Sequence, residues 1–251
     1  IMPKKNNKKE SVYQVYGIHN CLSVLNRPIY NIINIFILDE KVSDYNKVFS
    51  YKKYGEKIHH LNKNDFNKKF ENYRTQGIVI VFTGDLIKNI NGVSFDKNNS
   101  CLLILDQIED PQNAGQIIRT SECAGIDGII FPFHNSFKIS NTVLNVSQGA
   151  FVEVPLYEVT NISKTISDLK KNDFWIVGLE NGLDEKIWSD IDFSGKIAIV
   201  VGSEGKGIRK KVIEHCDFLA SIPMQGTTNS LNVSAAVSAI LFERLRQIKY
   251  I

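Results

Sequence analysis

The second half of the chain contains four short runs that are apolar at nearly every position: residues 101–105, 128–131, 174–179 and 197–201. A strand that is covered by helices on both faces of a parallel sheet has this pattern. Helical segments lie between the runs. Near the end of the chain, apolar residues recur every three or four positions from Val233 to Leu245, which is typical of an amphipathic helix. The pattern predicts a parallel α/β domain over residues 101–251.

The first half alternates between strand-like and helix-like stretches. Residues 12–16 and 18–25 lead into a strand expected at 32–38; further strands are expected at 57–61 and 78–82, and helices near 44–53 and 63–70. This alternation predicts a small α/β domain over residues 11–83. Residues 84–100 are rich in Asn, Gly, Lys and Ser, so we expect them to form a linker between the two domains.

The composition is that of a globular protein, with 43% hydrophobic and 23% charged residues. Charge is uneven: residues 1–80 carry 14 Lys and Arg against 7 Asp and Glu, and the rest carry 16 against 20. A basic first half suits an RNA-binding domain. The chain is rich in Lys and Asn throughout, however, so a general bias in composition explains the asymmetry equally well.

Metal, membrane and secretory functions have no support in the sequence. Four cysteines lie far apart, without a C-x-x-C pair, and the five histidines are not at metal-ligand spacing beside them. No apolar run approaches the roughly 18 residues of a membrane span. The basic first residues have no apolar segment behind them, unlike a secretory signal. We expect a cytoplasmic protein with reduced cysteines, no metal and no membrane partner.

The first of three unusual segments joins the end of a strand to a helix through Asp110-Pro111. Either Asp110 caps this helix, with Pro111 at its first position, or Asn113 does. Gly115 lies in an early helical turn, where it costs about 1 kcal/mol relative to Ala, so we expect a close neighbour there. Arg119 follows one turn later; taken alone, such an arginine is usually in a surface ion pair.

The second segment follows the apolar run 197–201 and reads Gly-Ser-Glu-Gly-Lys-Gly over residues 202–207. Three glycines after a buried strand indicate a loop whose backbone approaches a ligand. Their spacing does not match G-x-G-x-x-G, and the lysine lacks the context of a P-loop. Both common phosphate-binding interpretations fail, which argues against a nucleotide-cofactor oxidoreductase.

The third segment ends a strand at Ile222-Pro223-Met224 and reaches the last helix through Ser230-Leu231-Asn232-Val233-Ser234. Ser230 is expected to cap this helix. Asn232 is a poor helix former in the first turn, so a polar role is expected for it.

Taken together and in this order, the three segments resemble the motifs of the SpoU (TrmH-type) RNA ribose methyltransferases. These enzymes belong to the SPOUT superfamily, and the resemblance covers residues 101–248. It implies a deep trefoil knot, S-adenosylmethionine as the cofactor, and a homodimer with the active site built across the two subunits. It also implies methylation of a ribose 2′-hydroxyl in RNA.

The resemblance also assigns roles to individual residues. Arg119 would lie at the reacting hydroxyl, where it stabilises a developing alkoxide or binds the adjacent phosphate, since its pKa is too high for a base. Glu204 would orient Arg119 or accept the proton through water. The implied catalytic residues are Asn113, Arg119, Glu204, Ser230 and Asn232. The implied cofactor-binding residues are Val201, Gly202, Gly205, Ile222, Met224, Ser230, Leu231 and Val233.

The first half resembles the substrate-binding domain of the bacterial enzymes that methylate a guanosine of 23S ribosomal RNA, a domain similar to small ribosomal-protein-type RNA binders. The resemblance rests on residues 15–19, Val-Tyr-Gly-Ile-His, and on Gln76-Gly77-Ile78. Thr75 stands where that group has His, which weakens the substrate assignment. A transfer RNA methyltransferase and a non-catalytic ribosomal RNA-binding assembly factor remain as alternatives.

Overall fold

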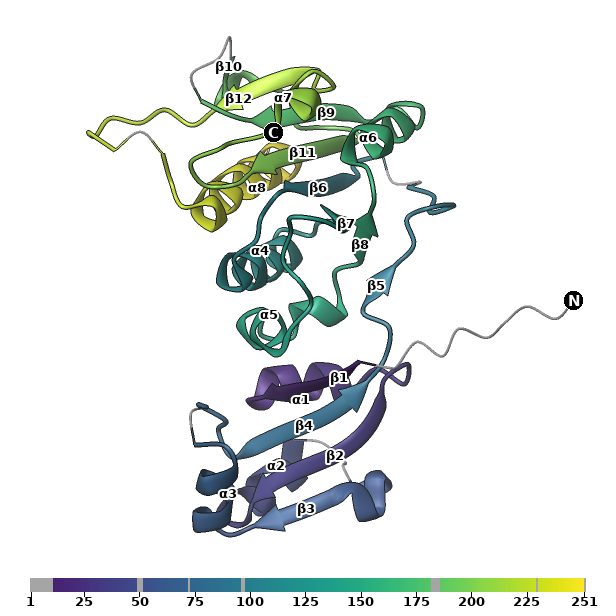
Figure 1. Ribbon diagram of the computed structural model, residues 1–251, viewed down its shortest axis with the longest axis vertical. Coiled ribbons are helices and arrows are strands. Elements are labelled where there is room, and N and C mark those ends of the chain that lie inside the picture. Colours follow the sequence, from purple (N-terminus) through teal and green to yellow (C-terminus); the bar gives the residue numbers. More distant parts are fainter. Residues whose placement is uncertain are drawn as a thin grey trace, which may run out of the picture. The chain divides into compact units, whose positions relative to one another are not determined.

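The computed structural model describes residues 11–48, 52–71, 73–95, 98–181, 186–228 and 230–250 (Figure 1). The chain divides into two compact units, Ile1–Asp85 and Leu86–Ile251, and each is described by itself.

The first unit is a four-stranded mixed sheet in the order β1-β4-β2-β3, in which only β2 and β3 are parallel. The predicted α/β pattern is confirmed. The helix expected near 44–53 is shorter: α2 ends at Val48, residues 49–51 lie outside the described residues, and a 3-10 segment occupies Lys52–Lys57. The elements are β1 (Val12–Tyr16), α1 (Ile18–Leu25), β2 (Asn31–Leu38), α2 (Val42–Val48), β3 (Ile58–Leu61), α3 (Lys63–Lys69) and β4 (Ile78–Thr83).

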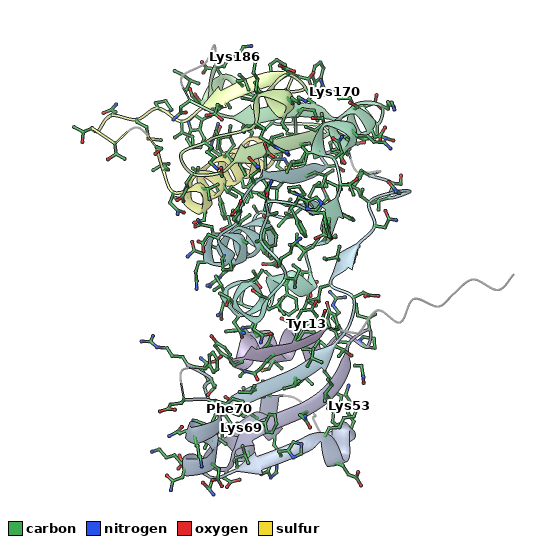
Figure 2. All side chains as sticks on the ribbon, in the orientation of Figure 1. Tyr13, Lys53, Lys69, Phe70, Lys170 and Lys186 are labelled. Carbon is green, nitrogen blue, oxygen red and sulfur yellow. The ribbon has the colours of Figure 1, made fainter. Side chains whose placement is uncertain are left out.

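Aromatic side chains join α3 to the sheet of this unit. Phe70, just after α3, contacts the ring of Phe36 on β2 with centroids 5.4 Å apart, and Lys69 lies over that ring at 4.7 Å. Figure 2 labels Phe70 and Lys69 near α3. His59 on β3 stacks on Phe36 at 5.0 Å. The lysine and the histidine therefore border an aromatic surface at one side of the sheet.

The two short motifs of the first unit meet in space although 58 residues separate them. The backbone N–H of Ile18, at the start of α1, donates to Gln76 Oε1 at 2.9 Å. The backbone N–H of Gly17 donates to the carbonyl of Thr75 at 3.2 Å. Thr75 is buried, and its hydroxyl accepts from Gly77 N at 3.2 Å. The threonine thus has a structural role in holding this turn.

The second unit is built on an eight-stranded sheet in the order β10-β12-β9-β11-β6-β7-β8-β5, parallel at every pairing (Figure 1). The predicted parallel sheet is confirmed, and the four apolar runs form β6, β7, β9 and β11. The expected linker contributes β5, which pairs with β8. The strands are β5 (Ile87–Lys88), β6 (Cys101–Asp106), β7 (Gly128–Pro132), β8 (Leu156–Val159), β9 (Trp175–Leu179), β10 (Lys186–Ile187), β11 (Ile197–Gly202) and β12 (Phe218–Ser221).

Helices cover this sheet. Alternate residues of its central strands pack against α6 and α7 in one buried cluster. Elsewhere α4 packs against α8 and α5, and α8 also contacts β11. The helices are α4 (Pro111–Cys123), α5 (Asn141–Val146), α6 (Ile162–Lys170), α7 (Lys210–Ile213) and α8 (Val233–Tyr250).

Gly115 is explained by helix packing rather than by a ligand. A Cβ at this position would lie 2.6 Å from Val146 Cβ and 2.9 Å from the carbonyl oxygen of Val143, both on α5. Asp110 caps α4: its carboxylate accepts from Gln112 N at 3.2 Å and Asn113 N at 3.1 Å. The side chain of Asn113 is therefore not used as the cap.

The last helix begins later than the sequence indicated. It starts at Val233, and Asn232 Oδ1 accepts from the backbone N–H of Ser234 at 3.0 Å. The expectation that Ser230 caps this helix is therefore wrong. Asn232 directly precedes the first helical residue, so its side chain reaches the backbone N–H of Ser234. Ser230 lies two residues earlier and is too far away to make this bond.

Candidate active site

A cavity of about 500 Å³ lies at the carboxyl ends of β9 and β11, beside the segment that follows β12 and the start of α8. Ligands of open α/β sheets bind at this edge of the sheet. All eight residues assigned to cofactor binding from the sequence line this one cavity: Val201, Gly202, Gly205, Ile222, Met224, Ser230, Leu231 and Val233.

The Gly-Ser-Glu-Gly-Lys-Gly loop folds back over its own strand. The backbone N–H of Gly207 donates to the carbonyl of Ser203 at 2.9 Å, and the turn between them includes Gly205, with φ +79°. A Cβ at Gly202 would lie 2.0 Å from the carbonyl carbon of Gly207, so only glycine allows the two backbones to cross here. The loop thus lies against its own strand and forms one wall of the cavity.

Glu204, at the tip of this loop, accepts hydrogen bonds from residues of the other two segments. Its Oε1 accepts from Asn232 Nδ2 at 2.6 Å, from Val233 N at 3.2 Å and from Asn113 Nδ2 at 3.3 Å. Asn232 Nδ2 also donates to Asn113 Oδ1 at 3.0 Å. We call Asn113, Glu204 and Asn232 the polar cluster. One residue from each of the three segments is present in it.

A hydrogen-bonded chain connects the polar cluster to α4. The hydroxyl of Ser234 lies 2.6 Å from Asn232 Oδ1 and 2.7 Å from Gln116 Oε1. One turn further along, the hydroxyls of Thr120 and Ser238 lie 3.3 Å apart. Contacts between α4 and α8 therefore fix the amide of Asn232.

Arg119 lies outside this cluster. It is exposed on α4, one turn beyond Gln116, and makes no hydrogen bond or ion pair with any residue that the structure describes. Glu204 is bonded to the two asparagines instead, so within one chain it does not orient Arg119. The guanidinium is open to solvent and able to meet a ligand.

A smaller cavity of about 250 Å³ adjoins the first. Ser203, Glu204, Lys206 and Val233 line both cavities. The smaller one extends along the loop after β6, where Asn113 borders it. Two ligands could therefore lie on either side of Glu204.

Sequence reasoning assigned no role to four charged residues here. Asp106 is fully buried at the end of β6 and binds Arg209, accepting from its backbone N–H and from Nε, both at 2.8 Å. This pair anchors the segment after the glycine loop. Glu180 and Lys206 line the larger cavity. A charged residue directly after an apolar strand, as Glu180 is after 174–179, was the available signal.

None of the four thiols is arranged as a nucleophile. All are free, and burial raises the pKa of Cys101 and of Cys216 to about 12. Burial likewise raises the pKa of Cys21, and partial burial beside Glu122 raises that of the exposed Cys123. Since the thiolate is the reactive form, these cysteines are poorly suited to covalent catalysis.

The described residues include no group of three or more His, Cys, Asp or Glu placed to hold a metal ion. No helix among them is long and apolar enough to cross a bilayer.

The fold and site together define an α/β enzyme domain with a preformed cavity at the carboxyl edge of a parallel sheet, bordered by a polar cluster. The sequence pattern of the SpoU rRNA Methylase family matches residues 100–242, more than half of the chain, and the chain belongs to this family. The pattern described as RNA 2′-O ribose methyltransferase substrate binding matches residues 14–85.

Relatives agree with this family. The chain is 35% identical to the 23S rRNA (guanosine-2′-O-)-methyltransferase RlmB of Haemophilus influenzae, over 93% of this chain and 97% of that protein. It is 44% identical to a putative TrmH family tRNA/rRNA methyltransferase of Staphylococcus saprophyticus, over 61% of each. The fold is shared with the crystal structure of the SpoU methyltransferase AviRb from Streptomyces viridochromogenes in complex with AdoMet. The TM-score is 0.78 at 19% sequence identity, and the match covers 95% of this chain and 91% of that one.

Proposed function

We propose that this protein transfers a methyl group from S-adenosylmethionine to the ribose 2′-hydroxyl of a guanosine in 23S ribosomal RNA. The observation that carries the proposal is the convergence of three separate segments on one cavity beside the polar cluster. The names of its full-length relatives and the substrate-binding pattern over residues 14–85 support the choice of RNA.

The residues of the larger cavity suit an adenosyl group. Ile222, Met224 and Leu231 present apolar side chains for a flat base, and the glycine loop leaves backbone groups accessible. S-adenosylmethionine, when bound, supplies an electrophilic methyl group on a positively charged sulfur. The remaining cofactor contacts are assigned to Val201, Gly202, Gly205, Ser230 and Val233.

The protein's own residues then act on the acceptor. The hydroxyl must lie within about 3–3.5 Å of the methyl carbon, and the smaller cavity across Glu204 has room for the acceptor ribose. Asn113 and Asn232 hold Oε1 of Glu204, which leaves Oε2 available to accept the hydroxyl proton directly or through water. Arg119 stabilises the developing alkoxide or the neighbouring phosphate. Ser230 donates to the ribose or phosphate.

The active enzyme is a homodimer in this proposal, because Arg119 is exposed and bonded to no described residue of its own chain. Phe242 on α8 is 48% exposed, as expected for an apolar residue at a subunit contact. Light scattering at working concentration should give twice the mass of one chain, and a monomer would contradict the dimer. The chain's knot, implied by its family, is part of the same proposal.

Labelled methyl transfer from S-adenosylmethionine to separated ribosomal and transfer RNA, followed by nuclease mapping, tests the substrate. Label in a guanosine of 23S RNA is the expected result. The Staphylococcus relative, whose name includes both RNA classes, keeps transfer RNA as the second candidate. Label only in transfer RNA would reject the ribosomal assignment, and no label in either would favour a non-catalytic assembly factor. Free thiols and a ribosomal substrate both suit the cytoplasm.

A further inference from the structure

Glu180 follows β9 directly and lines the larger cavity, where two hydrogen bonds hold it in place. Its backbone N–H donates to the carbonyl of Ala220, the β12 residue that pairs with Leu179, at 3.0 Å. Its carboxylate oxygen Oε2 accepts from the backbone N–H of Ile208 at 2.7 Å. The side chain is half-buried and lines the cavity together with Leu179 and Asn181.

The last glycine of the loop makes room for this carboxylate. A Cβ at Gly207 would lie 2.4 Å from Glu180 Oε2 and 2.6 Å from Oε1, so any other residue would displace the side chain. Gly207 also has φ +65°, which glycine adopts without strain. The loop and Glu180 are therefore matched to each other, and the carboxylate is fixed in place before any ligand binds.

The Glu180 carboxylate can bind only hydrogen-bond donors of an adenosyl group. An ionised carboxylate only accepts hydrogen bonds. The two adjacent ribose hydroxyls offer donors that one carboxylate can bind, and in other α/β folds an acidic residue near the binding crevice binds ribose in this way. Oε1 makes no hydrogen bond with any residue that the structure describes, so it is available for such a donor.

We propose that Glu180 binds the ribose hydroxyls of the adenosyl cofactor and so fixes the sugar in the larger cavity. This inference rests on the proposed function, since it assumes that S-adenosylmethionine occupies that cavity. It adds a residue that directly follows β9 to a site otherwise built from the segments after β6, β11 and β12.

Calorimetric titration with three probes tests the assignment: S-adenosylmethionine, S-adenosylhomocysteine and 5′-methylthioadenosine. All three carry the ribose, the first two carry the amino acid, and only the first carries the sulfonium charge. Glu180→Gln should weaken all three by a similar factor, about tenfold or more, because a hydrogen bond to a charged group is lost. A loss limited to S-adenosylmethionine, or to the two probes with an amino acid, would overturn the ribose assignment, as would no loss.

The Gln variant keeps the wall of the cavity, because its amide oxygen can still accept from Ile208 N. Its melting temperature should match that of the wild type. Glu214→Gln is the control: Glu214 is an exposed carboxylate that lines neither cavity, so affinity for the three probes should not change.

A second measurement begins with the wild type, so its first comparison does not depend on the folding of a variant. The wild type should bind 5′-methylthio-2′-deoxyadenosine or its 3′-deoxy counterpart about tenfold more weakly than 5′-methylthioadenosine. In Glu180→Gln this discrimination should shrink to a small factor, which a purely structural role would not cause. Equal wild-type affinity for all three nucleosides would overturn the inference. Failure of the wild type to bind S-adenosylmethionine would instead reject the proposed function, and this inference with it.

Discussion

Asn232 Nδ2 lies 2.6 Å from Glu204 Oε1, across a sequence separation of 28 residues. The same amide nitrogen lies 3.0 Å from Asn113 Oδ1, 119 residues away. These contacts join the loop after β11, the start of α8 and the start of α4 at one point. The position of the Glu204 carboxylate is therefore set by residues from three distant parts of the chain.

The charge of Glu204 can be tested without disturbing that geometry. In Glu204→Gln the amide oxygen can still accept from Asn232, Asn113 and Val233, while the ability to take a proton is lost. Turnover should fall by about 100-fold or more, as for other general bases. Binding of S-adenosylmethionine should change little. Single-turnover methylation assays measure the first effect and calorimetry the second; activity close to wild type would show that Glu204 only holds the loop.

Arg119 should be needed for turnover and not for cofactor binding. Arg119→Ala is expected to lower the rate by about 100-fold or more, because a donor to developing negative charge is removed. Arg119→Lys should recover only part of the rate, since lysine keeps the charge but not the planar set of donors. Lys171→Ala, an exposed lysine paired with Asp168, is the control. Near-normal turnover of Arg119→Ala would exclude this role.

Gly202→Ala should destabilise the protein because its Cβ would overlap the backbone of Gly207. Neither backbone can move without opening the loop, so we expect a loss of about 3 kcal/mol, at the upper end of the usual cost of overpacking, together with loss of cofactor binding. Gly205→Ala is the matched control. Unlike Gly202, it has a left-handed φ of +79°, but no atom lies within 4 Å of the new Cβ, so only the backbone strain of about 1–2 kcal/mol is expected. Urea unfolding measures both; equal losses would contradict the backbone crossing.

Asp106→Asn should weaken the anchoring of the segment after the glycine loop. Asp106 is fully buried, and breaking a buried ion pair usually costs about 3–5 kcal/mol. Because the Arg209 side chain is 45% exposed and can find water, we expect about 1–3 kcal/mol. Asp168→Asn, in an exposed pair with Lys171, is the control and should leave the unfolding free energy unchanged within the error of the measurement. An unchanged midpoint for Asp106→Asn would remove the pair from any anchoring role.

The fold could be predicted where sequence alone determines burial. The four apolar runs became β6, β7, β9 and β11 because a strand between two layers of helices has no polar face. The two-residue strands β5 and β10 could not be predicted, since their pairing with β8 and β12 depends on contacts brought together only by the folded chain. The segment expected as a linker contributes β5 for the same reason.

The candidate site was predictable to the extent that its residues lie in short motifs. All eight expected cofactor residues line one cavity, while their individual roles stay predictions. The hydrogen bonds of the site could not be predicted from the sequence. Asn232, not Ser230, caps α8. Glu204 is hydrogen-bonded to asparagines rather than to Arg119. The reason for a glycine at position 115 was ambiguous in the sequence. A glycine that allows a neighbouring helix to pack closely and one that allows a ligand to approach cannot be distinguished there, and the structure shows the first.

The larger and smaller cavities share the wall formed by Ser203, Glu204, Lys206 and Val233. A molecule that shifts this wall from one side changes the shape available on the other. Donor and acceptor should therefore influence each other's affinity, and by linkage the effect must be equal in both directions. The factor by which the methyl donor changes the affinity for RNA should therefore equal the factor by which RNA changes the affinity for the methyl donor.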